Sequence, residues 1–132
     1  MIRFTIPGVR LVSEANAHEH FRARQARAKS QRGQAYTLAC HAIGPELVEW
    51  LDGPLVVTIV RIAPTRLDSD NLVGSAKHVR DGVADALGID DRDLRVTWHV
   101  EQRRGGVRVY GVEVTIAEAV ACPTCGSVRG AA

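Results

Sequence analysis

The chain is organised around residues 55–72, LVVTIVRIAPTRLDSDNL. Leu55 to Ile62 form a nearly unbroken apolar run rich in β-branched side chains, which predicts a strand in the middle of a sheet with both faces largely covered. The chain then leaves the end of that strand. Asp68 and Asp70 are therefore expected at the rim of the sheet, where ligand sites of α/β sheets commonly form.

Two helices are predicted, one before and one after that strand. The first begins at capping candidates in residues 13–16 and ends near Ile43, before Gly44 and Pro45. The second runs from Asp70 to about Leu87, because apolar side chains recur three and four residues apart along it. That apolar face consists of Leu72, Ala76, Val79, Val83 and Ala86.

Strands are also predicted at residues 2–6, 94–101 and 107–116, with a turn at residues 103–106 joining the last two. The resulting order β-α-β-α-β-β predicts an α+β domain: a small mixed sheet with two helices on one face and a C-terminal antiparallel hairpin. We expect residues 1–117 to form this domain. Residues 118–132 are expected to be a flexible tail with a lone CxxC pair.

Composition indicates an ordinary globular chain. It has 132 residues, of which 45% are hydrophobic and 24% charged, enough for a single core. The net charge of +2 is too small to indicate a nucleic-acid partner by itself. The apolar runs are too short to span a bilayer, and the N-terminus lacks the apolar segment of a signal peptide. A cytoplasmic protein without a membrane partner is therefore expected.

Acidic residues lie on both sides of the second predicted helix. Asp68 and Asp70 lie at its start, whereas Asp90 and Asp91 follow its end, so the two pairs could converge on a divalent cation. Carboxylates with few fixed partners suit Mg²⁺, which keeps several waters and shares its coordination with substrate phosphates. The alternative interpretation makes Asp70 a helix cap and leaves the acidic turn as ordinary surface.

The start Asp68-x-Asp70 is also that of a calcium-binding loop. Counted from Asp68, such a loop needs Gly at its sixth position and Glu at its twelfth, where this chain has Val73 and Val79. The calcium loop is therefore excluded. Lys77 and Asp81 can also be interpreted as an i, i+4 pair on the exposed face of the helix.

The acidic motif resembles that of a known enzyme family. Asp68-x-Asp70-Asn71-Leu72, a lysine on the following helix, Asp85-Ala86-Leu87 and then Asp90-Asp91 before a strand are similar to the RusA-type Holliday junction resolvases of bacteria and their phages. The similarity covers the middle third of the chain. The best-known members carry the lysine four residues after the second aspartate, where this chain has Gly74, and Lys77 stands three residues further on.

The resemblance implies a magnesium-dependent endonuclease that cleaves branched DNA during recombination and repair, acting as a homodimer. It implies that Asp68, Asp70 and either Asp90 or Asp91 hold Mg²⁺, or Mn²⁺ in its place, and that Lys77 assists cleavage. The alternative is a catalytically silent RusA-like protein that binds or regulates DNA, which the displaced lysine favours. Magnesium-dependent nicking of a four-way junction separates the two.

The first predicted helix is strongly basic and contains no acidic residue between His20 and Pro45. Two interpretations are open, a solvated face or a surface that contacts the phosphate backbone of DNA. The same two interpretations apply to the predicted hairpin tip. The candidate DNA-binding residues are Arg22, Arg24, Arg27, Lys29, Arg32, Arg103 and Arg104.

Cys122 and Cys125 have the spacing of one zinc knuckle. A closed structural zinc site needs four ligands, and this segment supplies two. An unliganded tail and a zinc site shared between two chains therefore both remain open.

Overall fold

The computed structural model describes residues 1–16, 18–45, 49–90 and 92–131. These residues form three α-helices, five strands and short 3₁₀ turns at Glu14–Asn16 and Glu49–Asp52. The helices are α1 (Phe21–Ile43), α2 (Ser69–Ser75) and α3 (Lys77–Leu87). The strands are β1 (Ile2–Pro7), β2 (Leu55–Ala63), β3 (Val96–Arg104), β4 (Gly111–Ala121) and β5 (Val128–Gly130). Within the described ranges, no helix is both long enough and apolar enough to cross a membrane.

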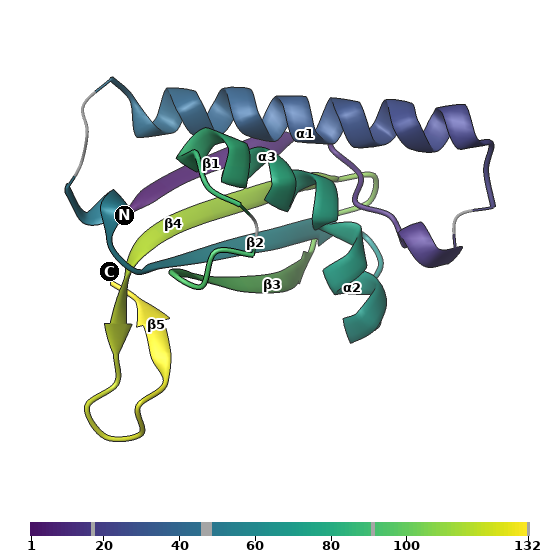
Figure 1. The fold of residues 1–132 in the computed structure, drawn as a ribbon. Helices are drawn as coiled ribbons and strands as arrows, with labels where there is room; N and C mark the ends of the chain where they lie inside the picture. Colours follow the sequence, from purple (N-terminus) through teal and green to yellow (C-terminus); the bar gives the residue numbers. More distant parts are fainter. Residues whose placement is uncertain (17, 46–48, 91, 132) are drawn as a thin grey trace.

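The sheet is mixed and has the strand order β1-β4-β2-β3 (Figure 1). β2 pairs in parallel with β3 and antiparallel with β4, and β4 pairs antiparallel with β1. The α+β class, the mixed sheet and the central position of residues 55–62 are therefore confirmed.

The hairpin predicted from residues 94–101 and 107–116 is wrong. β3 pairs with β2, while β4 crosses to the other side of β2 and lies between β2 and β1. The crossing begins where the Gly105 N–H donates to the Ala63 carbonyl at the end of β2. In this position Val112, Val114 and Ile116 of β4 are completely buried, so pairing on both sides of β4 gains more apolar burial than a local hairpin would.

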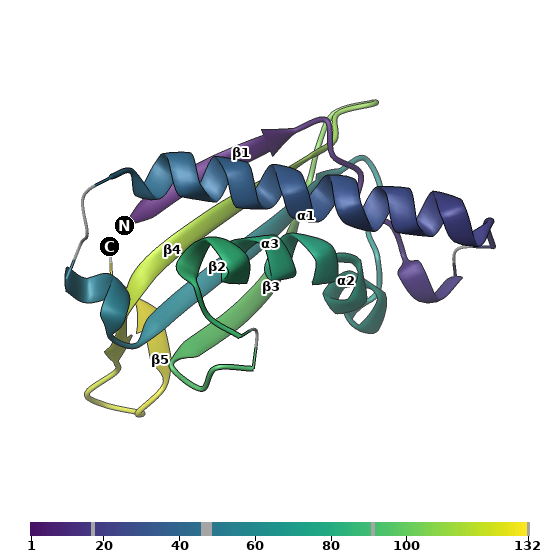
Figure 2. The ribbon, with the colours of Figure 1, turned by 45° about the horizontal axis from the view of Figure 1, so that its top comes forward.

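Both long helices cover one face of the sheet, as Figures 1 and 2 show for α1 and α3. The core lies between them and the strands. Its fully buried members include Ile6, Val57, Ile59, Val79, Val83, Val114 and Ile116.

The helices differ from the expected ranges. The first predicted helix begins only at Phe21, after a 3₁₀ turn, and the Arg22 N–H donates to the His20 side chain at its start. The second predicted helix is broken at Ala76 into α2 and α3. Such a break lets the two segments take different directions, which spacing along a single helical face could not indicate.

The segment expected to be a tail contains regular structure. β4 continues through residue 117, the expected domain boundary, to Ala121, and β5 pairs with its last residues. Residues 119–130 therefore form a hairpin at the end of the sheet.

Candidate functional site

Two buried or half-buried polar side chains hold the loop between β2 and α2. Arg61, buried in β2, donates from Nε to the Leu11 carbonyl at 2.9 Å and from Nη1 to the Thr65 carbonyl at 2.6 Å. Burial lowers the pKa of this guanidinium, which faces carbonyl oxygens. The side chain of Gln102 in β3 accepts the Leu67 N–H at 3.0 Å and donates to the Leu67 carbonyl at 2.8 Å. The sheet thereby fixes the approach to Asp68.

Asp68 and Asp70 lie at the start of α2, and we call them the α2 acidic end. Asp68 is the N-cap, because its Oδ1 accepts the Asn71 N–H at 3.1 Å. The Asn71 side chain in turn accepts the Ser13 hydroxyl at 2.8 Å. Asp70 is exposed in the first turn, where a carboxylate also complements the helix dipole.

A glycine allows α3 to lie very close to α1. A Cβ atom at Gly82 would meet the Ala35 Cβ at 2.8 Å and the Tyr36 nitrogen at 3.0 Å, besides the Arg32 carbonyl. Ala35 and Ala39 of α1 are completely buried. Small residues on both helices thus set their separation.

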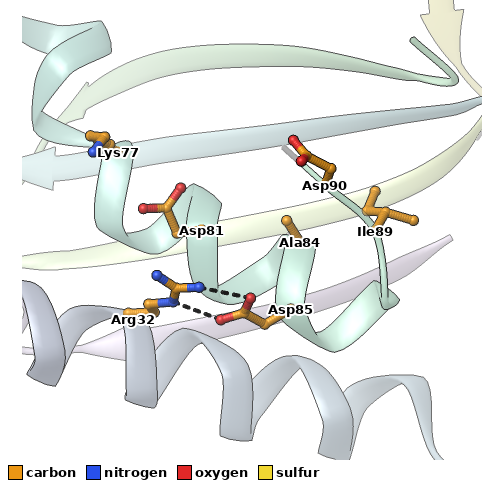
Figure 3. Close-up of a pocket in the computed structure, with 7 residues that line it drawn as sticks. All are labelled: Arg32, Lys77, Asp81, Ala84, Asp85, Ile89 and Asp90. Carbon is orange, nitrogen blue, oxygen red and sulfur yellow. Dashed lines mark hydrogen bonds and ion pairs between the residues drawn. The ribbon is translucent and has the colours of Figure 1, made fainter. Parts of the chain in front are cut away.

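This packing borders a cavity of about 440 Å³, which we call the α3 pocket (Figure 3). Its lining residues come from α1, from α3 and from the turn after α3. They are Arg32, Lys77, Asp81, Ala84, Asp85, Ile89 and Asp90. The chain turns back after Gly88, whose φ of 68° is left-handed, and so brings Asp90 to the cavity that Lys77 lines from the start of α3.

Some charges of the α3 pocket are already paired. Arg32 binds Asp85 through two hydrogen bonds of 2.7 and 2.9 Å, and this contact lowers the pKa of the Asp85 carboxyl. Asp90 accepts the Arg92 N–H at 2.9 Å and forms an exposed ion pair with the same arginine. Lys77 and Asp81 make no ion pair within the described residues. They are the groups in the α3 pocket most available to a ligand.

The structure brings together only part of the predicted site. Lys77 and Asp90 line the α3 pocket, whereas Asp68 and Asp70 do not. Asp91 lies outside the described residues. Asp81 was not predicted as a site residue, although its i, i+4 spacing from Lys77 was a usable signal.

Lys77 stands between the two acidic regions. It follows α2 directly and lines the α3 pocket, and it also lines a second cavity of about 330 Å³ with Gly74, His78 and Glu14. Carboxylates therefore lie before and after this lysine along the chain.

The basic helix is less free than its sequence suggests. Arg27 binds Glu14 at 2.7 Å and also pairs with Glu19, contacts that lower the pKa of both carboxyls. Arg32 pairs with Asp85. The helix contains no acids, but the ion-pair partners of Arg27 and Arg32 come from residues outside it.

The other candidate DNA-binding residues differ in their surroundings. Arg24 donates to the Glu14 carbonyl at 3.4 Å, and Arg103 forms an exposed pair with Glu113 at 3.5 Å. Arg22, Lys29 and Arg104 are exposed, and the described part of the chain offers them no ion-pair partner. Arg103 and Arg104 end β3 instead of forming a hairpin tip.

The donor chemistry of the α3 pocket suits a hard cation only in part. No group of three His, Cys, Asp or Glu side chains that could hold a metal occurs among the described residues. Mg²⁺, however, is commonly held by one or two carboxylates together with waters and substrate phosphates. Asp81 and Asp90 are two carboxylates in the lining of the α3 pocket, the number that such a shared site uses.

The chain is similar in sequence to a bacterial protein. An uncharacterized protein of Xylella fastidiosa (strain Temecula1 / ATCC 700964) is 38% identical over 94 residues, which cover 70% of this chain. The matched region spans 61% of the length of that relative. No model of a known protein family matches the chain.

Proposed function

We propose that the protein is a magnesium-dependent endonuclease that cleaves branched DNA, with its active site at the α3 pocket. The observation that carries this proposal is that Lys77 and Asp81, both without an ion-pair partner among the described residues, line one cavity with Asp90. The resemblance of residues 68–91 to RusA-type resolvases supports the branched substrate and adds Asp68, Asp70 and Asp91 to the set of carboxylates. Mn²⁺ is expected to substitute for Mg²⁺.

Each residue of the α3 pocket has a defined task in this proposal. Asp81 and Asp90 would hold the cation, which when bound lowers the pKa of a water and offsets charge on the scissile phosphate. Arg92 would leave Asp90 readily, because the pair is exposed and such pairs contribute little. The Lys77 ammonium would stabilise negative charge as it develops on the phosphate oxygens. Asp85 would remain bound to Arg32 and hold the wall of the pocket.

The DNA partner would be contacted by exposed cations near the α3 pocket and on α1. Arg22 and Lys29 lie on α1, and Arg24 lines the second cavity together with Lys77. Contacts of this kind bind phosphate without reading sequence, so their loss should weaken binding to all DNA and reduce its salt dependence. Paired incisions across a four-way junction call for two copies of the site, so a homodimer is part of the proposal.

The proposal is tested by magnesium-dependent nicking of a four-way junction. We expect Asp81→Asn to lower the cleavage rate about 100-fold or more, because it removes charge without changing shape. Binding of the junction should be unchanged or tighter. Asp52→Asn is the matched control, since Asp52 is exposed and does not line the α3 pocket.

Two results would count against the proposal. Equal cleavage by wild type and Asp81→Asn would remove the α3 pocket as the active site. Junction binding without any cleavage by the wild-type protein, in Mg²⁺ or Mn²⁺, would favour a catalytically silent DNA-binding protein. Asp70→Asn, which we also expect to abolish cleavage, then shows whether the α2 acidic end belongs to the same site.

A further inference from the structure

The β4–β5 hairpin carries two cysteines at its tip. The strands pair through Ala119 with Gly130 and Ala121 with Val128, and residues 122–127 form the connection. The base of the hairpin packs closely against the sheet: Gly130 is so near Ala117 that an added Cβ atom would lie 2.9 Å from the Ala117 Cβ. Figure 1 shows the tip extending from the end of the sheet, away from α1. The hairpin thus presents its tip to the solvent from an anchored base.

Backbone hydrogen bonds fix the turn between the cysteines. The Cys122 N–H donates to the Ser127 carbonyl at 2.7 Å, and the Gly126 N–H donates to the Cys122 carbonyl at 2.9 Å. Gly126 has φ of 73°, the left-handed conformation that favours glycine. The sequence Cys-Pro-Thr-Cys-Gly therefore folds into a closed loop that holds both cysteines on one short turn.

The Cys122 and Cys125 side chains lie close together on this turn. The Cys125 Sγ is 3.0 Å from the Ser127 hydroxyl oxygen, and the cysteines are free thiols. Because the two cysteine side chains are close neighbours on one closed turn, both sulfurs can bind the same ion.

A single chain supplies only this pair of sulfurs at the site. The third cysteine, Cys40, lies on α1, away from the hairpin. Within the described ranges, no third His, Cys, Asp or Glu joins Cys122 and Cys125. Thiolates at C-x₂-C spacing are preferred ligands of Zn²⁺, which in structural sites takes four ligands in a tetrahedron.

We propose that the Cys122–Cys125 turn is half of a zinc site, and that two copies of the chain complete a Zn(Cys)₄ centre through their hairpin tips. Two identical two-sulfur arms satisfy a tetrahedral ion around a two-fold axis, which is the common symmetry of a homodimer. The exposed Cys125 and the extended tip leave room for the second arm. Each chain contributes two thiolates, and their protons are released to solvent on binding. This site is separate from the α3 pocket.

The test measures zinc content and assembly together. The full chain is purified in a thiol-free reductant, equilibrated with Zn²⁺ and desalted, and its zinc is quantified by mass spectrometry. We expect about one zinc per two chains, the ratio set by four thiolates per ion. The double variant Cys122→Ser with Cys125→Ser should fall to background, whereas the control Cys40→Ser should keep the full ratio. With Co²⁺ in place of zinc, the wild type should show the strong visible absorption of a tetrahedral thiolate complex.

Sedimentation then tests the sharing between chains. We expect the zinc-loaded wild type to sediment as a dimer, and a chelator to remove the zinc and weaken that dimer. Three results would overturn the proposal: no bound zinc in the reduced protein, equal zinc in the double cysteine variant, or one zinc on each monomeric chain. Retained circular dichroism and unfolding midpoint in the double variant show that a lost zinc ratio reflects the ligands and not the fold.

Discussion

The α2 acidic end and the α3 pocket lie on consecutive helices but are built in different ways. Asp68 is held locally, through its own cap hydrogen bond and through the side chains of Arg61 and Gln102 that fix the preceding loop. Asp81 lies one turn after Lys77 on α3, Asp90 joins them because the chain turns back after Gly88, and Arg32 completes the lining because α3 packs on α1. The first region depends on neighbours along the chain and on the sheet rim, whereas the second depends on helix packing.

The difference teaches which acids can be recognised before a structure is known. A cap followed by a helix leaves a local sequence signal, so Asp68 and Asp70 stand out as a motif. A pocket that depends on close contact between helices leaves little local signal in the sequence. The role of Gly82 is recognised only once the α1 residues beside it are known. The predictions below separate the two regions by changing one kind of support at a time.

The largest effect is expected from Gly82→Ala. The added methyl would collide with the Ala35 side chain and with α1 backbone, so we expect a loss of about 1–3 kcal/mol in the free energy of unfolding. The α3 pocket should be disturbed with it. Gly74→Ala is the control, because a Cβ atom there meets nothing within 4 Å, and it should stabilise α2 by about 0.5–1 kcal/mol. Urea unfolding measures both, and equal shifts in the same direction would refute close packing at Gly82.

A smaller effect is expected at the cap of α2. Asp68→Ala should lower the free energy of unfolding by about 1 kcal/mol, because the Asn71 N–H loses its side-chain acceptor. Asp68→Asn should leave stability nearly unchanged, since asparagine caps helices as well as aspartate. If the α2 acidic end also serves cleavage, both variants should lose activity. Full activity in Asp68→Asn would limit this residue to capping.

The smallest effect is expected from Arg32→Ala. Arg32 lowers the pKa of Asp85, so the stability it adds is present above the ordinary carboxyl pKa and is lost as the pH falls through the lowered value. Without Arg32, the pKa of Asp85 should return upward toward its ordinary value. Carboxyl titration followed by NMR measures this shift. An unchanged Asp85 titration would show that the pair does not persist in solution.

Several elements were predictable because their signals are local. The apolar run of residues 55–62 gave the central strand, and the caps and glycines located both helical regions. Long-range pairing was not predictable in the same way. The turn-like residues 103–106 favoured a hairpin, but burial of Val112 and Ile116 between β1 and β2 placed β4 elsewhere.

The candidate site divides in the same manner. Lys77 and Asp90 were predicted and do line one pocket. Asp81 was interpreted as half of a surface pair with Lys77, because the other pocket residues Arg32 and Asp90 come from α1 and from the turn after α3. The partners of Arg27 also lie outside its helix, so a count of acids within the helix could not reveal them. Ion pairs can join residues that are distant in the sequence, and a local stretch of sequence does not reveal such partners.

The strand order also bears on how the chain is made. β1 pairs with β4, so Ile2 finds its partner Ile116 only after the residues between them have been synthesised. Until then, β2 and β3 can pair, but β1 has no neighbour in the sheet and β2 keeps one edge open. Contacts this distant in sequence slow folding, and unpaired strand edges favour aggregation. Completion of the sheet on the ribosome must therefore wait for the strand that is inserted last into its middle.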